Sequence, residues 1–330
     1  MIKCDGCGVP LQQEHVEELG YTRNIEGKLC ERCFRIRHYG DYKRVIKNND
    51  DYIQILKHIN QTGDLVVLVV DLFQMNENFD LIKRTLTDNP ILLVLTKRDL
   101  LPKKVYEEKL LHYMDQFCLH EVDRLIISST KSYQFDQLIA KIREYQKSKD
   151  VYVVGYTNAG KSTMMNQLIY HYSDLRQTIT TSMLPSTTLE EIRVPIDDDL
   201  LLIDTPGILE EGSILDMVDT SLLKKILPKV EIRPLTYQVK SPQTFLVDTL
   251  VQVACQDNND LTFYLSNQLK IERKYQIIEK MNGLERHILE LNGNQDIVIT
   301  GLGFIKVMKK GTITIDTLPS VKVYIRKALI

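Results

Sequence analysis

Between residues 48 and 212 the chain alternates short apolar runs with longer stretches that mix polar and apolar positions. The apolar runs are Leu65–Val70, Ile91–Leu95, Leu125–Ile127, Val151–Val154 and Leu200–Ile203. The stretches that indicate helices are Val105–Cys118, Phe135–Lys147 and Ser162–Tyr172. Near-continuous apolar strands separated by helices are typical of a parallel sheet covered on both faces. The pattern predicts an α/β domain with a mostly parallel sheet at residues 48–212.

The pattern changes on both sides of this domain. Residues 1–47 are loop-rich and carry four of the six cysteines, which predicts a small separate domain. Residues 213–330 combine a helix-like stretch, Gln268–Met281, with strand-like segments at Ile297–Ile299 and Thr312–Ile315, which predicts an α+β domain. A length of 330 residues agrees with more than one core.

The segment from Gly155 to Ser162 matches the phosphate-binding P-loop pattern, with a strand before it and a helix after it. Glycines let backbone N–H groups converge on a phosphate without Cβ clashes, and the helix N-terminus adds its dipole. Lys161 supplies positive charge to the β- and γ-phosphates, and Ser162 offers a hydroxyl to Mg²⁺. The residues expected to bind nucleotide here are Gly155, Asn158, Ala159, Gly160, Lys161, Ser162 and Thr163.

Two further motifs follow the P-loop. The strand Leu200–Ile203 ends in Asp204-Thr205-Pro206-Gly207, in which Asp204 would hold Mg²⁺ through water and the Gly207 N–H would meet the γ-phosphate. Between them lies Pro185-Ser186-Thr187-Thr188, a loop whose Thr188 could close over Mg²⁺. Thr187 stays open as the alternative. The expected Mg²⁺ ligands are therefore Ser162, Thr188 and Asp204.

Base recognition is predicted by Thr96-Lys97-Arg98-Asp99, directly after an apolar run. The Asp99 carboxylate can accept from N1–H and the N2 amine of guanine, whereas adenine would leave this acceptor unpaired. Lys97 would pack its stem across the base. A second loop, Ser128-Ser129-Thr130-Lys131, would offer a backbone N–H to guanine O6. The residues expected at the base are Thr96, Lys97, Asp99, Ser128 and Ser129.

The base motifs precede the P-loop, which indicates a circular permutation of the usual order. Permutation is physically reasonable because the termini of compact domains lie near each other. The chain would then pass from Gly207 directly into residues 213–330, so that loss of the γ-phosphate would pull on this C-terminal region.

The sequence lacks a water-orienting side chain for hydrolysis, because Ile208 stands where a Gln is common. Asn158 can help to hold a K⁺ ion beside the phosphates; the alternative is that it only caps the loop. The residues expected to act in hydrolysis are Lys161, Thr188 and Asn158, with a slow intrinsic rate.

The amino-terminal segment carries two CxxC pairs separated by 22 residues, Cys4–Cys7 and Cys30–Cys33. Four thiolates at this spacing predict a tetrahedral, structural Zn²⁺ site that keeps a small domain folded. His38 could replace one ligand. Cys118 and Cys255 stand alone and are expected to be buried core residues.

Charge adds a local hint. The net charge is −2, but residues 23–47 hold eight Lys/Arg against three acids, and residues 301–330 hold six against one. Such stretches fit polyanion contact or ordinary solvated faces. No apolar run reaches the roughly 20 residues of a membrane span, so a cytoplasmic protein without membrane contact is expected.

Together the CxxC pairs, Thr-Lys-Arg-Asp, the P-loop, Pro-Ser-Thr-Thr and Asp-Thr-Pro-Gly resemble the YqeH family of circularly permuted GTPases, over nearly the whole chain. The resemblance implies a GTP-hydrolysing assembly factor for the small ribosomal subunit that contacts its rRNA, and it leaves ribosomal proteins open as further partners. The family's C-terminal domain is thought to contact RNA or protein. Departures from the family pattern are Thr96 for Asn, Ser129 for Ala and Ser186 for Gly.

Two other readings compete with this one. The first is a nucleotide-gated scaffold that binds a protein partner and barely hydrolyses GTP. The second, more distant, is an adenine-specific kinase or ATPase.

Overall fold

The computed structural model describes residues 10–14, 21–22, 24–25, 49–75, 77–172, 184–185, 192–208, 210–240 and 242–330. The chain divides into two compact units. The first unit comprises Met1–Asp71, Asn76–Lys97 and Phe117–Leu209, as far as these are described. The second comprises Leu72–Met75, Arg98–Gln116 and Glu210–Ile330.

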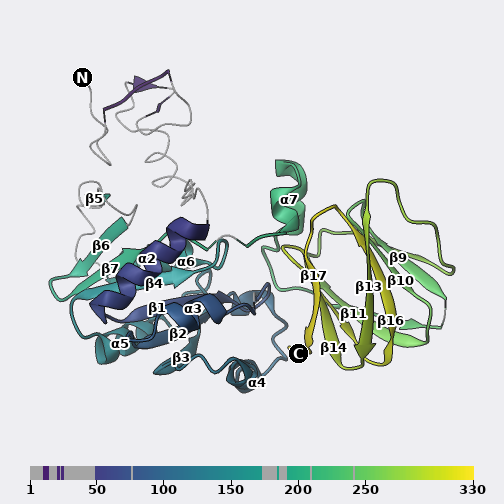
Figure 1. Ribbon diagram of the computed structural model, residues 1–330, viewed down its shortest axis with the longest axis horizontal. Coiled ribbons are helices and arrows are strands. Elements are labelled where there is room, and N and C mark those ends of the chain that lie inside the picture. The colour runs from purple at the N-terminus through teal and green to yellow at the C-terminus, as the bar shows by residue number, and fades with distance from the viewer. Residues whose placement is uncertain are drawn as a thin grey trace. The chain divides into compact units, whose positions relative to one another are not determined.

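The first unit is built on a seven-stranded sheet in the order β3-β2-β1-β4-β7-β6-β5 (Figure 1). Its parallel strands are β1 (Val66–Asp71), β2 (Ile91–Thr96), β3 (Asp123–Ile126), β4 (Asp150–Gly155) and β7 (Leu200–Asp204). Two antiparallel strands, β6 (Ile192–Asp197) and β5 (Leu184–Pro185), extend one edge. The five apolar runs of the sequence therefore form the predicted mostly parallel sheet.

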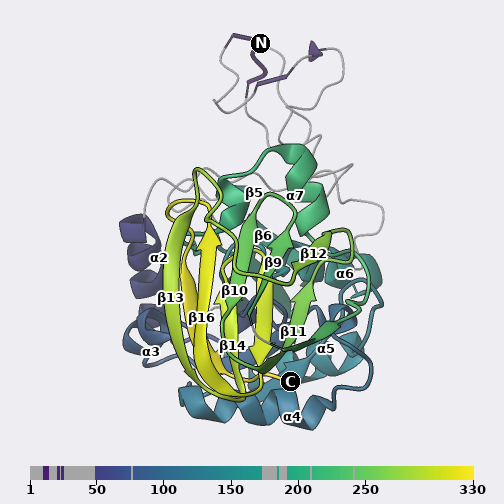
Figure 2. The same ribbon diagram turned by 90° about the vertical axis from the view of Figure 1, so that its right-hand side faces the viewer.

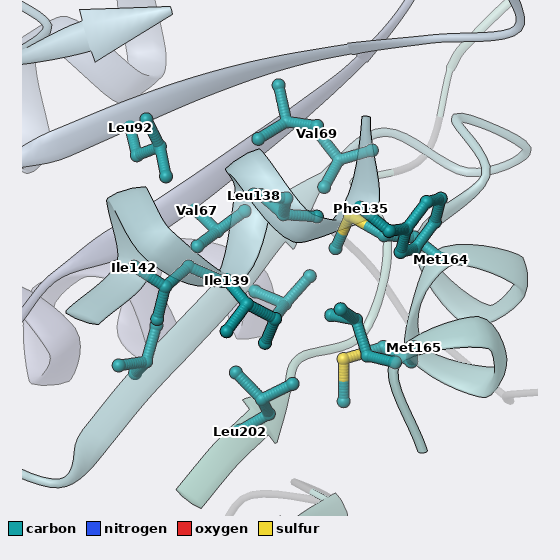
Figure 3. Close-up of a cluster of buried hydrophobic side chains, with 14 of the residues drawn as sticks. Val67, Val69, Leu92, Phe135, Leu138, Ile139, Ile142, Met164, Met165 and Leu202 are labelled. Atoms are coloured by element: carbon teal, nitrogen blue, oxygen red, sulfur yellow. The ribbon is translucent and has the colours of Figure 1, made fainter. Parts of the chain in front are cut away.

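Helices lie on both faces of this sheet. On one face, α5 (Phe135–Tyr145) and α6 (Lys161–Tyr172) direct Leu138, Ile142 and Met164 onto Val67, Val69 and Leu92 (Figure 3). The alternate residues of β1 point to the opposite side, where α2 (Asn49–Thr62) and α3 (Asp80–Thr85) lie (Figure 1). All six residues of β1 and of β2 are buried for this reason.

The second unit contains two five-stranded antiparallel sheets that share one hydrophobic core (Figure 2). One sheet is ordered β12-β9-β10-β16-β13 and the other β17-β14-β15-β11-β8. The strands are β8 (Leu235–Val239), β9 (Gln243–Val247), β10 (Val251–Cys255), β11 (Asn259–Leu265), β12 (Ile271–Lys274), β13 (Glu285–Asn292), β14 (Gln295–Ile299), β15 (Gly303–Val307), β16 (Lys310–Thr317) and β17 (Val323–Lys327). Its α-helices, within the described residues, are α4 (Glu107–Tyr113) and α7 (Thr220–Ile226).

The sequence pattern was partly misleading in this region. Both predicted strands lie within β14 and β16, but the predicted helix at Gln268–Met281 is wrong. Leu269 is buried, and Ile271–Lys274 form strand β12, which pairs with β9. Pairing with a distant strand overrides a local preference for helix, so most of residues 213–330 is β-structure rather than α+β.

The two lone cysteines differ from each other. Cys255 is buried in the core of the second unit, as expected, and burial raises the pKa of its thiol to about 11. Cys118 is exposed, so the expectation that it belongs to a core is wrong. It follows the 3-10 helix Met114–Phe117 and adopts a positive φ of 48°, which places it at a turn.

Two short segments beyond residues 210–330 also belong to the second unit, and both follow strands of the parallel sheet. After β1, the Phe73 ring lies 6.1 Å from the Phe304 ring, and Gln74 Nε2 donates to Gly301 O at 2.7 Å. After β2, the Tyr113 hydroxyl donates to Lys327 O at 3.1 Å. The sheet of β17, β14, β15, β11 and β8 therefore packs against chain from the first hundred or so residues.

No described helix is long and apolar enough to cross a membrane.

Candidate nucleotide-binding site

The predicted motifs meet at the carboxyl edge of the parallel sheet. β1 ends at Asp71, β2 at Thr96, β4 at Gly155 and β7 at Asp204, while Ser128 lies two residues after the end of β3. Carboxyl ends of neighbouring parallel strands share one edge, and ligands of α/β sheets bind where the strand order reverses, which here is between β1 and β4.

The P-loop requires glycine at two positions. A Cβ at Gly155 would lie 2.3 Å from Val69 O of the neighbouring strand, which no side chain tolerates. Gly160 has a φ of +94°, a left-handed conformation that glycine adopts without strain. The two glycines of the motif thus serve close strand packing at its start and a tight turn into α6 at its end.

Lys161 lies inside the loop and is only 8% exposed. Its Nζ donates to Gly155 O at 2.8 Å and to Tyr156 O at 2.9 Å. Ser162 is half-buried and Thr163 exposed in the first turn of the helix. The ammonium group is therefore fixed within the phosphate-binding loop.

The segment after β7 is bonded to the P-loop through its backbone. Thr157 N donates to Ile208 O at 2.8 Å, and Ile208 N donates to Gly155 O at 3.1 Å. A Cβ on Gly207 would lie 3.0 Å from Lys161 Nζ, so glycine permits this approach. Ile208 itself is buried, with 4% exposure. The two phosphate motifs thus form one continuous site.

Asp204 is buried at the end of β7, and its carboxylate, like the Ser162 hydroxyl, is an oxygen group of the kind that Mg²⁺ prefers. Tyr52 of α2 is buried beside Thr205 and Asp204, and this burial raises the pKa of its phenol well above the usual range. Tyr52 therefore stays protonated and adds no charge beside the acid. Sequence reasoning missed Tyr52, because nothing in its local pattern marks it.

The base motif is anchored to the P-loop by Thr96. Its hydroxyl lies 2.6 Å from Ala159 O and 3.2 Å from Val70 O, and its side chain is buried. A hydroxyl carries one proton, so the shorter contact to Ala159 is the favoured hydrogen bond. Thr96 therefore anchors the motif at the position where the family pattern has Asn.

Lys97 has an unusual backbone and a fixed side chain. Its φ is +60°, and its Nζ lies 2.7 Å from Asp71 Oδ2. Asp71 is 7% exposed at the end of β1. Sequence reasoning missed Asp71, although an acid that ends an apolar run at Val70 is a usable signal. The ion pair directs the Lys97 stem along the edge of the sheet.

The loop after β3 is closed on itself. Tyr133 N donates to Ser128 O at 3.1 Å, and Lys131 N donates to the same oxygen at 3.3 Å. Ser128 and Ser129 are buried. Asp99 lies in the second unit, on the 3-10 helix Arg98–Leu100, and is half-buried.

Asn158 is exposed at the tip of the P-loop with a φ of +60°. Asparagine tolerates this conformation better than most residues, so its position has a backbone reason besides the predicted K⁺ contact. Thr188 and Thr187, and Cys4, Cys7, Cys30 and Cys33, lie outside the described residues. Within the described ranges, no group of three or more His, Cys, Asp or Glu could hold a metal ion.

A P-loop bonded to Asp-Thr-Pro-Gly, with the base motif on an earlier strand, defines a P-loop GTPase of permuted order. The RsgA GTPase family matches residues 43–213, about half of the chain, and the family described as 50S ribosome-binding GTPase matches residues 150–292. Protein YqeH of Bacillus subtilis is 34% identical over 100% of this chain and 99% of its own length. The chain belongs to the YqeH family of circularly permuted GTPases. As a GTPase it binds GTP and GDP with Mg²⁺ and hydrolyses GTP.

Two more distant relatives match over parts of their length. NO-associated protein 1, chloroplastic/mitochondrial, of Arabidopsis thaliana is 26% identical over 73% of this chain and 49% of its own length. An uncharacterized GTP-binding protein of Methanocaldococcus jannaschii is 27% identical over 78% of this chain and 65% of its own length. The chain thus spans nearly the full length of the bacterial relative but about half of the plant one.

The Thr96 anchor can be tested by removing its hydroxyl. Thr96→Val keeps the shape but leaves the carbonyl oxygen of Ala159 without its donor, which should lower the free energy of unfolding by about 1–3 kcal/mol and weaken GDP binding. Thr96→Ser keeps the hydroxyl and should retain most of both. Chemical denaturation and GDP titration check this; a Val variant as stable as wild type would show that the contact is not an anchor.

Proposed function

We propose that this GTPase is an assembly factor for the small (30S) ribosomal subunit, that it acts in the cytoplasm, and that it contacts rRNA, with ribosomal proteins as further partners. One observation supports this most. The γ-phosphate motif is bonded to the P-loop at Ile208, and the second unit resumes at Glu210. A change at the phosphates thus has a two-residue path into the part of the chain that resembles the family's partner-binding domain.

The proposed nucleotide site follows the predicted roles. Asp99 reads the guanine edge, Lys97 packs along the base, and the loop of Ser128 and Ser129 meets O6. The P-loop from Gly155 to Thr163 holds the phosphates. Ser162, Asp204 and Thr188 ligate Mg²⁺, which neutralises charge on the β- and γ-phosphates.

The proposed division has three domains: a zinc-binding domain at residues 1–47, the GTPase domain at 48–212 and an interaction domain at 213–330. The basic residues of the first and last of these domains support contact with a polyanion. In the last of these domains, however, Arg326 is buried and Lys306 half-buried, so four of the six basic residues counted after Gly301 are exposed: Lys309, Lys310, Lys322 and Lys327.

A second candidate is a nucleotide-gated scaffold with little hydrolysis. The buried Ile208 favours it, because an apolar side chain at this position cannot orient the attacking water. The two candidates differ in turnover and in partner. A scaffold would bind its partner at full strength without measurable phosphate release.

Co-sedimentation with ribosomal subunits tests the proposal. The full chain with a non-hydrolysable GTP analogue should sediment with 30S particles, and GDP should release it. Added salt should weaken binding to the particle. If the protein contacts rRNA phosphates, the logarithm of the affinity should fall linearly with the logarithm of the salt concentration. Lys161→Ala, which cannot respond to the γ-phosphate, should lose the nucleotide dependence. Binding to 50S particles alone, or to neither subunit, would contradict the proposal.

The zinc site is tested by metal content. Protein purified without oxygen should carry about one Zn²⁺ per chain, because four thiolates make one site. Cys30→Ser should lose most of the metal, whereas Cys118→Ser should keep it, since Cys118 is a single exposed cysteine. Both variants should still bind GDP. Zinc retained by the Cys30 variant and lost from the Cys118 variant would refute the assignment.

Potassium dependence tests how hydrolysis proceeds without a water-orienting Gln. If Asn158 helps to hold K⁺, hydrolysis should be several-fold faster in K⁺ than in Na⁺ at equal ionic strength, which keeps screening constant. Asn158→Gly should abolish the difference while preserving the positive φ of the loop. Phosphate release in both salts is the measurement. Equal rates for the wild type would remove K⁺ from the mechanism.

A further inference from the structure

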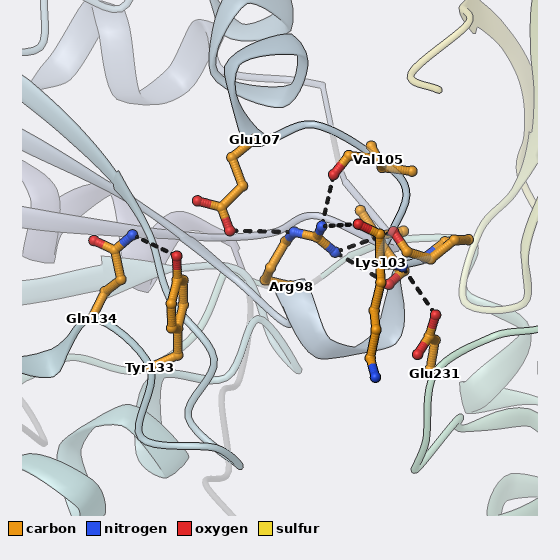
Figure 4. A network of polar contacts seen from close by, with 9 residues as sticks. Arg98, Lys103, Val105, Glu107, Tyr133, Gln134 and Glu231 are labelled. Atoms are coloured by element: carbon orange, nitrogen blue, oxygen red, sulfur yellow. Dashed lines mark hydrogen bonds and ion pairs between the residues drawn. The ribbon is translucent and has the colours of Figure 1, made fainter.

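Arg98, the variable position of the Thr-Lys-Arg-Asp motif, lies immediately before Asp99 and within the second unit. Its guanidinium group is surrounded by the backbone of the loop that follows (Figure 4). One terminal nitrogen, Nη2, donates to Val105 O at 2.7 Å and lies 3.4 Å from Lys103 O; the other, Nη1, donates to Leu101 O at 3.2 Å. Its Nε lies 3.4 Å from Glu107 Oε1, and the side chain is only 14% exposed.

These contacts add to the backbone hydrogen bonds of the loop, in which Val105 N donates to Pro102 O at 3.0 Å. Residues 101–106 form neither helix nor strand, and Pro102 has no N–H to donate. The guanidinium fork carries five donors in a fixed plane and can serve several carbonyls at once, which a lysine ammonium cannot do in the same geometry. Nη1 also lies 3.4 Å from Pro102 O, so one side chain joins the residue before Asp99 to four carbonyl groups after it.

The same loop is fastened to the C-terminal part of the second unit. Ile232 N donates to Leu100 O at 2.9 Å, directly after Asp99. Lys103 N donates to Glu231 Oε1 at 3.0 Å (Figure 4). Glu231 is held in turn, because its carbonyl accepts from Asn267 Nδ2 at 2.9 Å. The turn that carries Asp99 is therefore bonded on one side by Arg98 and on the other by residues 231–232.

The first half of the motif is fixed independently. Thr96 is bonded to Ala159, and Lys97 to Asp71, all within the first unit. These contacts set where the motif begins but do not reach Asp99. Asp99 leads directly into the loop behind it, and that loop is bonded to Arg98 and to Glu231.

We propose that Arg98 is a positioning residue for guanine recognition. Arg98 holds the turn that carries Asp99, and Glu231 and Ile232 bond this turn to the C-terminal part of the second unit. This inference rests on the proposed reading of guanine by Asp99. Base specificity then depends on residues more than one hundred positions away from the motif in the sequence. A loosened loop would misalign the Asp99 carboxylate without removing it.

The two hydrogen bonds expected at Asp99 supply a selective readout. Guanine offers N1–H and the N2 amine, whereas the hypoxanthine base of inosine diphosphate offers N1–H alone. A carboxylate that is aligned for both donors favours GDP over IDP, and misalignment reduces this preference. General destabilisation of the protein weakens both nucleotides by the same factor and leaves their ratio unchanged. The GDP/IDP affinity ratio therefore separates positioning from mere stability.

The experiment measures GDP and IDP affinities of the full chain by titration. In Arg98→Ala the GDP affinity should fall about tenfold, and the GDP/IDP ratio should fall with it, because one well-placed hydrogen bond to a charged acceptor is worth about a factor of ten. Arg98→Lys keeps the charge but lacks the fork, so it should not restore the ratio. Glu231→Ala should lower the ratio by a smaller factor.

Two controls fix the interpretation. Arg286→Ala removes another arginine of the second unit, one paired with the buried Asp316 at 2.7 Å, and should leave the ratio unchanged. Asp99→Asn should lower the ratio more than any Arg98 variant. If Asp99→Asn lowers the ratio but Arg98→Ala and Glu231→Ala do not, the positioning role is overturned and the base-reading proposal stands. If Asp99→Asn leaves the ratio unchanged, the base-reading proposal fails first.

Circular dichroism and denaturation confirm that each variant is folded. Should Arg98→Ala fail to fold, Arg98→Lys and Glu231→Ala carry the test, and wild-type ratios in both would overturn the proposal.

Discussion

The parallel pairing of β1 with β4 is the contact on which the nucleotide site depends. It joins Val66 to Tyr152 and continues to Val69 and Gly155, where the carbonyl of Val69 occupies the space of a Cβ. The base motif lies on the β1 side of this seam and the phosphate motifs on the β4 side. Permutation has reversed their order along the chain, but the seam brings them to the same edge. Without a glycine at 155 the strands could not approach at the point where the P-loop begins.

Once this seam is formed, short hydrogen bonds extend it in both directions. Thr96 reaches across to the P-loop carbonyl of Ala159, and the backbone of Ile208 pairs with Gly155 and Thr157. The two phosphate motifs are therefore held to each other by main-chain groups, whereas the base motif is held to the P-loop by the Thr96 hydroxyl. This explains why Thr can replace Asn at position 96: the site needs a short donor there, and a hydroxyl supplies it at 2.6 Å.

The sequence predicted strands most reliably where both faces of the sheet are covered and every side chain of the strand is buried. Strands β1 and β2 are continuous apolar runs because each side chain is covered, and the chemical motifs follow directly after such runs. It was least informative where structure depends on a distant partner. Ile271 is placed by pairing with Val247 of β9, a partner that no local window of a single sequence contains, so the local pattern indicates a helix that the structure lacks.

The site shows the same division between local and distant causes. The motifs of Gly155, Lys161 and Asp204 predict roles for these residues directly. Asp71 and Tyr52 lie on other elements, where Asp71 pairs with Lys97 and Tyr52 lies beside Thr205 and Asp204. Asp71 could have been inferred from the acid that ends an apolar strand. Tyr52 could not, because its burial beside Thr205 results from the packing of α2 on the sheet. Segments 72–75 and 98–116 likewise join the second unit through contacts with partners such as Gly301 and Ile232.

Ile208 has a structural role in addition to the chemical group that it lacks. From the sequence it is the place where a water-orienting side chain is lacking. In the fold its N–H and carbonyl pair with the P-loop on both sides of Tyr156, and its side chain is buried. A polar amide at this point would have to give up its water without an assured partner, at a cost of about 1–3 kcal/mol. The buried isoleucine therefore stabilises the junction of the two phosphate motifs, and its apolar side chain offers the attacking water no polar partner at this position.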